Sequence, residues 1–274
     1  MSDPIDLGRP FVCIASKRLD ETAAFYQKLG FGLRPDDPPV PQVRALRQGT
    51  TTLCWLDFLN YSMVNYRGAS IHAMATELAS RGFQCWGLNH RGPEHQLFLD
   101  GEGDPLPDNE AGSFTIVDPD GYHIFFNTHP YERELYENNV WPVPQAYDGT
   151  LRNDDHMAAE LEKGPEGATL GRFIYQIAVK DLHASRDFYG RMGLRCENAA
   201  GGTVDVTGRQ SHMLEDPTAF PIRLRRADAP GVAFLFRSDD PATVADSLRV
   251  DVEDGPEGPT MTDPNGQKVV LVSA

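Results

Sequence analysis

His123 and Asp57 are the residues of this sequence best suited to acid–base chemistry. His123 lies near the start of an apolar run, residues 122–127, that has strand character. An imidazole exchanges protons near neutral pH, so His123 is a candidate general acid or base. Asp57 is a carboxylate within the apolar run L-C-W-L-D-F-L-N and could exchange protons if it faced a cavity. The structural alternatives are a histidine bonded within its sheet and an acid that faces solvent or pairs with an arginine.

Two loops contain residue types that bind metal ions. His90, Glu94 and His95 lie within N-H-R-G-P-E-H-Q, and His212 and Glu215 lie within S-H-M-L-E-D-P. Adventitious metal binding is conceivable there, but we do not predict a functional metal site. The sequence contains no G-x-S-x-G, P-loop or G-x-G-x-x-G motif, so hydrolase, NTPase and dinucleotide-binding functions have no support.

Hydrophobic periodicity predicts the elements that position these residues. Residues 19–29 and 70–80 have helical spacing and are followed by Gly30 and Gly82. Apolar and β-branched runs predict the strands of the first half of the chain, at residues 11–15, 51–59, 96–100, 113–117 and 122–127.

The chain contains an internal repeat. F-Y-Q-K-L-G-F at residues 25–31 returns as F-Y-G-R-M-G-L at 188–194, and D-P-D-G at 118–121 returns as D-P-N-G at 263–266. A repeated set of motifs indicates a duplicated structural unit. The second unit repeats the order of elements with shorter loops, and its expected strands and helices are residues 173–179, 182–192, 205–207, 222–225, 232–236, 241–248 and 268–272.

These motifs resemble the vicinal oxygen chelate superfamily, which includes glyoxalase I, extradiol dioxygenases, and fosfomycin- and bleomycin-resistance proteins. The resemblance covers roughly residues 10–128 and 172–274. It implies an α+β fold in which tandem βαβββ modules form two glyoxalase-like domains, with curved mixed sheets around a cup. The predicted domains are residues 1–130, with two modules, and 172–274, joined by a segment with a short helix at 131–171. Five apolar residues of that segment are expected to pack on one or both units: Tyr131, Leu135, Tyr136, Val140 and Trp141.

The resemblance also implies where a divalent metal would bind, because enzymes of this superfamily hold it in the cup. The corresponding positions here are apolar in both units: Phe11, Met63 and Phe125 in the first, and Ile174, Ala233 and Val270 in the second. A divalent ion needs nitrogen, oxygen or sulfur donors, and the Met63 thioether is only a weak one. Moving each strand by one residue does not produce a ligand set. We therefore predict no metal and no cofactor.

The same positions predict an apolar binding site instead. Side chains two residues apart on a strand share a face, so His123 accompanies Phe125, Cys13 accompanies Phe11, and Asn65 accompanies Met63. Trp55 joins them if the strand register allows it. Aromatic walls suit a planar ligand, and a few polar groups would orient it. The predicted ligand-binding residues are Phe11, Cys13, Trp55, Met63, Asn65 and Phe125.

Composition excludes several partners. The chain has 25 basic and 40 acidic residues, a formal net charge of −15, which disfavours nucleic acid and anionic membrane surfaces. No apolar run approaches the roughly 20 residues of a membrane span. The 4 cysteines are scattered, which is typical of reduced, buried thiols, so we expect a cytoplasmic protein.

The functional hypothesis is a metal-independent protein that binds a hydrophobic or aromatic small molecule in the cup of the first unit. It would either sequester this ligand or catalyse an acid–base isomerase, lyase or cyclase step through His123. One alternative is a metal-dependent glyoxalase-like or dioxygenase-like enzyme with ligands among His90, His95, His123 and His212. Another is a non-catalytic interaction protein, and a homodimer is left open.

Overall fold

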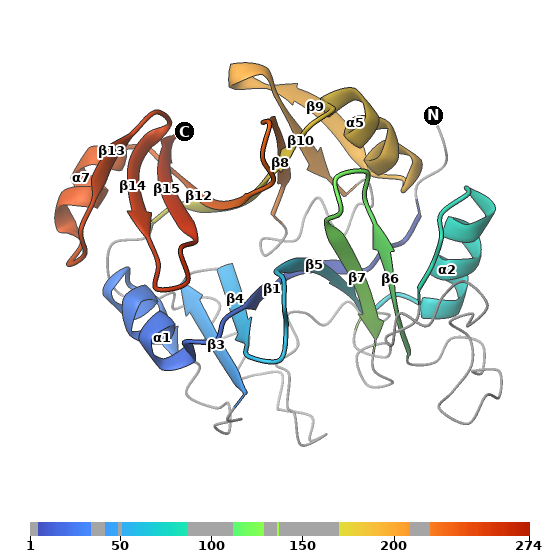
Figure 1. Cartoon of the computed structure of the whole chain (residues 1–274), viewed down its shortest axis with the longest axis horizontal. Coiled ribbons are helices and arrows are strands. Elements are labelled where there is room, and N and C mark those ends of the chain that lie inside the picture. Colours follow the sequence, from blue (N-terminus) through green and yellow to red (C-terminus); the bar gives the residue numbers. More distant parts are fainter. Residues whose placement is uncertain are drawn as a thin grey trace.

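Two mixed β-sheets form the framework of the molecule (Figure 1). The computed structural model describes residues 5–33, 42–48, 51–86, 112–128, 136, 170–208 and 220–274. One sheet is built from the first half of the chain and the other from the second half, as the sequence repeat predicts. The α+β architecture expected from the sequence is confirmed.

In the described residues, the first unit contains a seven-stranded sheet together with helices α1 and α2. In order across the sheet the strands are β2 (Gly32–Leu33), β3 (Val43–Gln48), β4 (Thr51–Leu56), β1 (Arg9–Ala15), β5 (Met63–Arg67), β7 (His123–Thr128) and β6 (Gly112–Val117). The helices are α1 (Leu19–Lys28) and α2 (Ile71–Ser80).

The second sheet has eight strands. Their order is β13 (Glu253–Gly255), β14 (Gly258–Thr262), β15 (Lys268–Ser273), β12 (Val232–Ser238), β8 (Arg172–Val179), β11 (Ile222–Arg226), β10 (Thr203–Thr207) and β9 (Arg195–Ala199). Where the structure describes this unit, its helical segments include α5 (Leu182–Arg191), the 3-10 turn η1 (Ala200–Gly202) and α7 (Pro241–Ser247).

Local sequence explains where the helices begin. The Ser70 hydroxyl accepts a hydrogen bond from the Ala73 N–H and caps α2, and the Asp181 carboxylate caps α5 in the same way. Asp240 caps α7, which has Pro241 in its first turn. After α1 and α2 the chain reverses at Gly30 and Gly82, both with positive φ.

One apolar core runs through both units. Phe31, after α1, packs edge-on against Phe236 of β12 at 5.9 Å between ring centroids. Phe83, after α2, packs against Phe188 of α5 at 5.1 Å. In Figure 1, α1 lies beside the β14–β15 hairpin and α5 lies beside the β6–β7 hairpin. Each unit therefore places a helix against a hairpin of the other.

The predicted connecting segment is described only at Tyr136 and at residues 170–171. Tyr136 packs on the first unit, where its ring lies against Gly68 and beneath the Arg9 guanidinium at 5.9 Å. Tyr131, Leu135, Val140 and Trp141 lie outside the described residues, as do the predicted strand 96–100 and the predicted short helix. Among the described residues, no helix has the length and apolar character that crossing a membrane requires.

Candidate functional site

The two faces of the first sheet differ in character. Ile14 pairs with Trp55, which contacts Tyr26 of α1, so this face packs on the helices. Its side chains form the core, and Val12, Ile14, Leu53 and Trp55 are 2% exposed or less. Because side chains alternate along a strand, the residues between them point to the other side of the sheet. We call that side the opposite face.

Five of the eight predicted site residues meet on the opposite face. Phe11 of β1 pairs with Asn65 of β5, and Asn65 pairs with Phe125 of β7. These three side chains form a row across adjacent strands, with the amide between two aromatic rings. Cys13 pairs with Met63 and begins a second row beside the first.

Asn65 is the most unusual member of this row. It is 2% exposed, and its amide N–H donates to the Cys13 sulfur at 3.7 Å. Its Oδ1 has no hydrogen-bond partner in the described part of the chain. An unsatisfied buried acceptor costs about 1–3 kcal/mol, and such atoms are rare in folded proteins. A ligand hydroxyl or N–H would supply the missing donor.

His123 joins the same face at the start of β7. Alternation along β7 places it on the same side as Phe125. Its ring stacks on Tyr61 from the turn before β5, with 4.0 Å between centroids and 30° between planes. Burial raises the pKa of Tyr61, so the phenol is neutral at physiological pH. The stack fixes the plane of the imidazole beside the row.

Cys13 is unsuited to nucleophilic chemistry. Burial raises the pKa of its thiol, and this outweighs the opposing influences of Arg67 and Asn65. A thiol rather than a thiolate therefore prevails at neutral pH. Its contribution to the face is its size and its weak acceptance of the Asn65 N–H.

Two predicted residues lie apart from this set. Trp55 is fully buried on the helix face, 4.5 Å from Tyr26 between ring centroids, so it lies on the other side of the sheet from the row. The pairing of Ile14 with Trp55 determines this, because it fixes the side to which the indole points. Asp57 directly follows β4, where its N–H donates to the Gln42 carbonyl at 3.1 Å and its own carbonyl accepts from the Lys17 amine. Both hydrogen bonds lie at the end of the strand and do not involve the residues of the row.

The positions implied for a metal do not offer metal ligands. Phe11 and Phe125 have no donor atom, and in the second unit Ile174, Leu235 and Val270 form a small apolar cluster across three adjacent strands. Among the described residues, no three His, Cys, Asp or Glu side chains gather closely enough to hold an ion. These residues do not fit a metal. His90, Glu94, His95, His212 and Glu215 lie outside the described residues.

Sequence reasoning missed three residues of this region. Arg9 and Arg67 pair directly across β1 and β5 on the opposite face, one step along from Phe11 and Asn65, and are 5% and 4% exposed. Arg9 is two residues from Phe11 and Arg67 is two residues from Asn65, so alternation along the strands could have placed both arginines on this face. Tyr61 could not be found in this way, because a turn brings it to His123.

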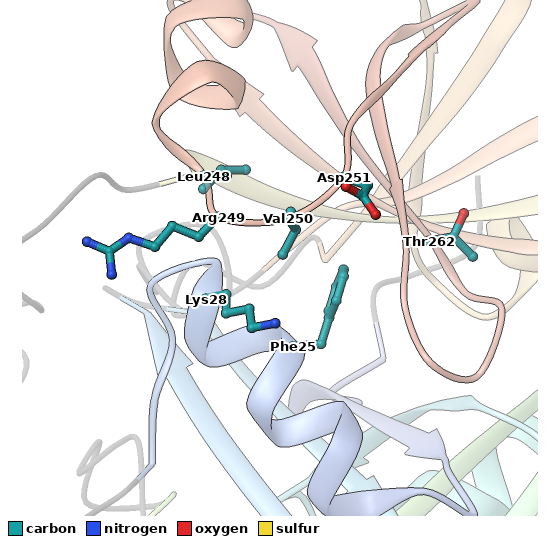
Figure 2. Close-up of a pocket in the computed structure, with 7 residues that line it drawn as sticks. All are labelled: Phe25, Lys28, Leu248, Arg249, Val250, Asp251 and Thr262. Carbon is teal, nitrogen blue, oxygen red and sulfur yellow. The ribbon is translucent and has the colours of Figure 1, made fainter.

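A separate cleft of about 500 Å³ lies between the units (Figure 2). Phe25 and Lys28 of α1 form one side, and the segment after α7 forms the other. None of the predicted site residues lines it. Its charged groups, Lys28, Arg249 and Asp251, are exposed to water, and we assign no ligand to it.

No protein-family model and no curated protein sequence matches this chain. Solved structures do match. Homoprotocatechuate 2,3-dioxygenase from Arthrobacter globiformis aligns with 100% of this chain and 82% of its own, at a TM-score of 0.59 and 14% identity. Catechol 2,3-dioxygenase aligns with 100% of this chain and 89% of its own, at a TM-score of 0.54 and 13% identity. An extradiol ring-cleaving dioxygenase from B. fuscum aligns with 99% of this chain and 73% of its own, at a TM-score of 0.54 and 13% identity.

The fold is that of the extradiol dioxygenases. The resemblance to the vicinal oxygen chelate superfamily, drawn from two short motifs, is therefore confirmed at the level of fold. The match extends over both units, so the tandem arrangement is shared as well. At 13–14% identity the likeness concerns the fold and leaves the chemistry to the residues of this chain.

Proposed function

We propose that this protein binds a small planar aromatic molecule that carries a hydrogen-bond donor, on the opposite face of its first sheet and without a metal. The observation that carries the proposal is the row Phe11–Asn65–Phe125, in which a buried amide oxygen without a described partner lies between two aromatic side chains.

The chemistry of the row supports an aromatic ligand. Phe11 and Phe125 are partly exposed, unlike the buried rings on the helix face, and aromatic side chains of this kind suit a planar ligand. Met63 adds a polarizable, adaptable wall beside them. Small-molecule sites are typically apolar with a few orienting polar groups, and Asn65 and His123 supply that polarity.

His123 decides between sequestration and catalysis. An imidazole beside the ligand could accept a proton from a ring hydroxyl or return one to a ring carbon, as an isomerase, lyase or cyclase step requires. Sequestration needs the apolar walls and Asn65 alone. His123→Ala therefore lowers affinity only modestly if the protein sequesters its ligand. If the protein is an enzyme, the same change abolishes turnover and leaves binding intact.

The proposal is tested by titrating the full-length protein with catechol, 2-naphthol and 7-hydroxycoumarin, followed by fluorescence and calorimetry. We expect saturable binding of at least one probe, weakened about tenfold or more by Phe125→Ala because stacking area is lost. Trp55→Phe is the matched control on the helix face and should leave affinity unchanged. Absence of binding by all three probes up to millimolar concentration would overturn the proposal.

A second candidate is a ring-cleaving dioxygenase, as the similar structures are. The observation in its favour is the match across both units to proteins of that activity. It requires metal ligands from residues outside those described, such as His90, His95 and His212. Elemental analysis of protein purified without an affinity tag or chelator tests it. Stoichiometric iron or manganese, with oxygen uptake on catechol, would establish this candidate in place of the first, and a metal-free protein after reconstitution would exclude it.

A further inference from the structure

The two repeated motifs contact each other across the units. Tyr189, from F-Y-G-R-M-G-L in α5, donates its hydroxyl to Asp118 Oδ2 of the first D-P-x-G turn at 3.2 Å. Tyr26, from F-Y-Q-K-L-G-F in α1, donates to Asp263 Oδ2 of the second turn at 3.5 Å. All four residues are at most 4% exposed. The duplication thus produces two mirrored hydrogen bonds, each joining a helix of one unit to a hairpin of the other (Figure 1).

Asp118 also holds the shape of its own turn. Its Oδ1 accepts from the backbone N–H groups of Asp120 and Tyr122, at 2.9 and 2.8 Å. The Asp118 N–H donates in turn to the Tyr122 carbonyl at 2.9 Å. One carboxylate therefore connects the second unit, through Oδ2, to Tyr122, the residue before β7, through Oδ1.

Tyr122 adds a contact that has no mirrored equivalent. Its hydroxyl lies 2.8 Å from the Ala178 carbonyl and 2.9 Å from the Gly231 carbonyl, and it accepts from the Gly231 N–H at 2.7 Å. These three groups belong to the second unit. The corresponding residue of the other turn, Gln267, donates instead to the Val232 carbonyl of its own unit.

Asp120 strengthens this attachment. Its carboxylate accepts from the Lys180 backbone N–H at 3.0 Å and from the Ser185 hydroxyl at 3.3 Å, both in the second unit. The second unit therefore holds the turn that leads into β7 at every second residue, through Asp118, Asp120 and Tyr122.

His123 is the next residue after Tyr122. We propose that Tyr189 and Tyr122 are positioning residues through which the second unit orients His123 at the site on the first. This inference rests on the proposed function, because it assigns a role to the His123 of that site. The corresponding face of the second sheet carries an apolar cluster of Ile174, Leu235 and Val270, which are 1%, 1% and 6% exposed.

The duplication supplies a matched control. Tyr189→Phe and Tyr26→Phe each remove one buried hydroxyl from a mirrored bond to an aspartate, but only the first bond leads to His123. Tyr122→Phe removes the hydroxyl contacts to Ala178 and Gly231 directly. All three variants keep the ring, and circular dichroism with thermal unfolding establishes that each is folded before comparison.

The primary measurement is the pH titration of the His123 ring protons by NMR in the free full-length protein, assigned with His123→Ala. We expect Tyr122→Phe and Tyr189→Phe to broaden or shift this titration while Tyr26→Phe leaves it unchanged. Affinity for 2-naphthol should fall about three- to tenfold in the first two variants and less than twofold in the control, the range that one net hydrogen bond supports.

The two proposals fail in different ways. If none of the three changes alters the His123 titration, or Tyr26→Phe alters it equally, the positioning role is overturned whatever the protein binds. If the titration responds as expected but neither the wild type nor the variants bind a probe, the positioning role stands and the proposed function fails.

Discussion

At the scale of single residues, Asn65 is the most unusual, because its polar side chain is buried and its amide oxygen accepts no hydrogen bond within the described residues. A polar amide that is 2% exposed, with an acceptor lacking a described partner, lowers the stability of the free protein. Such a group makes physical sense where a ligand completes its hydrogen bonds. At the proposed site, the unused acceptor would favour ligands with a donor over those of the same shape without one.

Asn65→Leu tests this preference. The change removes the unsatisfied oxygen and keeps the volume, so we expect the free energy of unfolding to stay equal or rise by about 1 kcal/mol. Affinity for 2-naphthol should fall to that for 2-methoxynaphthalene, which has no donor. Paired titrations and urea unfolding measure both effects. Gln176→Leu, at a buried amide of the second sheet, should not alter affinity, and a preserved preference for 2-naphthol in Asn65→Leu would contradict the role of Oδ1.

The burial of Asp118 predicts an unusual pH dependence of the protein's free energy of unfolding. Burial raises the pKa of its carboxyl from 3.8 to about 6, despite the hydrogen bonds from Tyr122, Asp120 and Tyr189 that lower it. Between about pH 4 and 6 the folded state then binds more protons than the unfolded state. The contribution of Asp118 to the free energy of unfolding therefore increases as pH falls through 6, by up to roughly 2–3 kcal/mol.

Asp118→Asn isolates this contribution, because an amide resembles the protonated carboxyl and can keep the turn bonds. We expect the wild type to gain stability relative to the variant between pH 7.5 and 4.5, measured as the difference between urea unfolding curves at each pH. The burial of Asp263 also raises its pKa, so Asp263→Asn should show the same sign. A pH-independent difference for Asp118→Asn would show that the carboxyl is already ionised without cost.

At the scale of elements, alternation along strands was the most informative feature of the sequence. It brought Phe11 together with Cys13, and Phe125 with His123, before any pairing was known. It could not assign Trp55, because the face of β4 depends on its register with β1, which the pairing of Ile14 with Trp55 sets. Nor could it find the stack of Tyr61 on His123, which depends on the path of a turn.

Some strands escaped prediction for a similar reason. β3, β9 and β13 contain mixed polar sequences whose strand conformation depends on the neighbours they pair with. The contacts between F-Y and D-P-x-G motifs join residues more than 70 positions apart. Each motif has a local role as helix or turn, and spacing alone does not reveal that the two kinds of motif touch.

The entry into the first strand of each unit makes a further element-scale prediction. Gly8 precedes β1 with φ of +78°, and a Cβ there would lie 2.2 Å from the Arg67 carbonyl oxygen. Gly171 precedes β8 with φ of +103° and would meet the Arg237 carbonyl oxygen at 1.9 Å. Backbone atoms of the paired strand cannot move aside as a flexible side chain can. Only glycine therefore allows these close strand pairings.

Gly8→Ala should lower the free energy of unfolding by about 3 kcal/mol, from the positive φ and the displaced strand together. Gly121→Ala is the matched control, because its φ is +89° but no atom lies within 4 Å of an added Cβ. Its cost should be about 1 kcal/mol. Urea unfolding of both variants measures the difference, and equal costs would mean that the strand pair adapts to the methyl group.

At the scale of the whole molecule, the two units share one apolar core. The core contains apolar residues from both sheets, and the contacts of Phe31 with Phe236 and of Phe83 with Phe188 join them. The mirrored bonds from Tyr26 and Tyr189 lie along the same boundary. The proposed site on the first sheet would therefore belong to a body whose core is shared with the second unit.

Phe236→Ala tests this unity. The side chain is fully buried at the boundary between the units, so its truncation should cost about 3–5 kcal/mol. If the units share one core, the loss lowers the stability of both equally. Hydrogen exchange of the β1 and β4 amides reports the first unit, and that of the β8 and β12 amides reports the second. We expect both probes to shift to the same lower urea midpoint, in the variant as in the wild type. A shift confined to β8 and β12 would mean that the units unfold independently, and the second unit could then hardly orient His123 through Tyr189 and Tyr122.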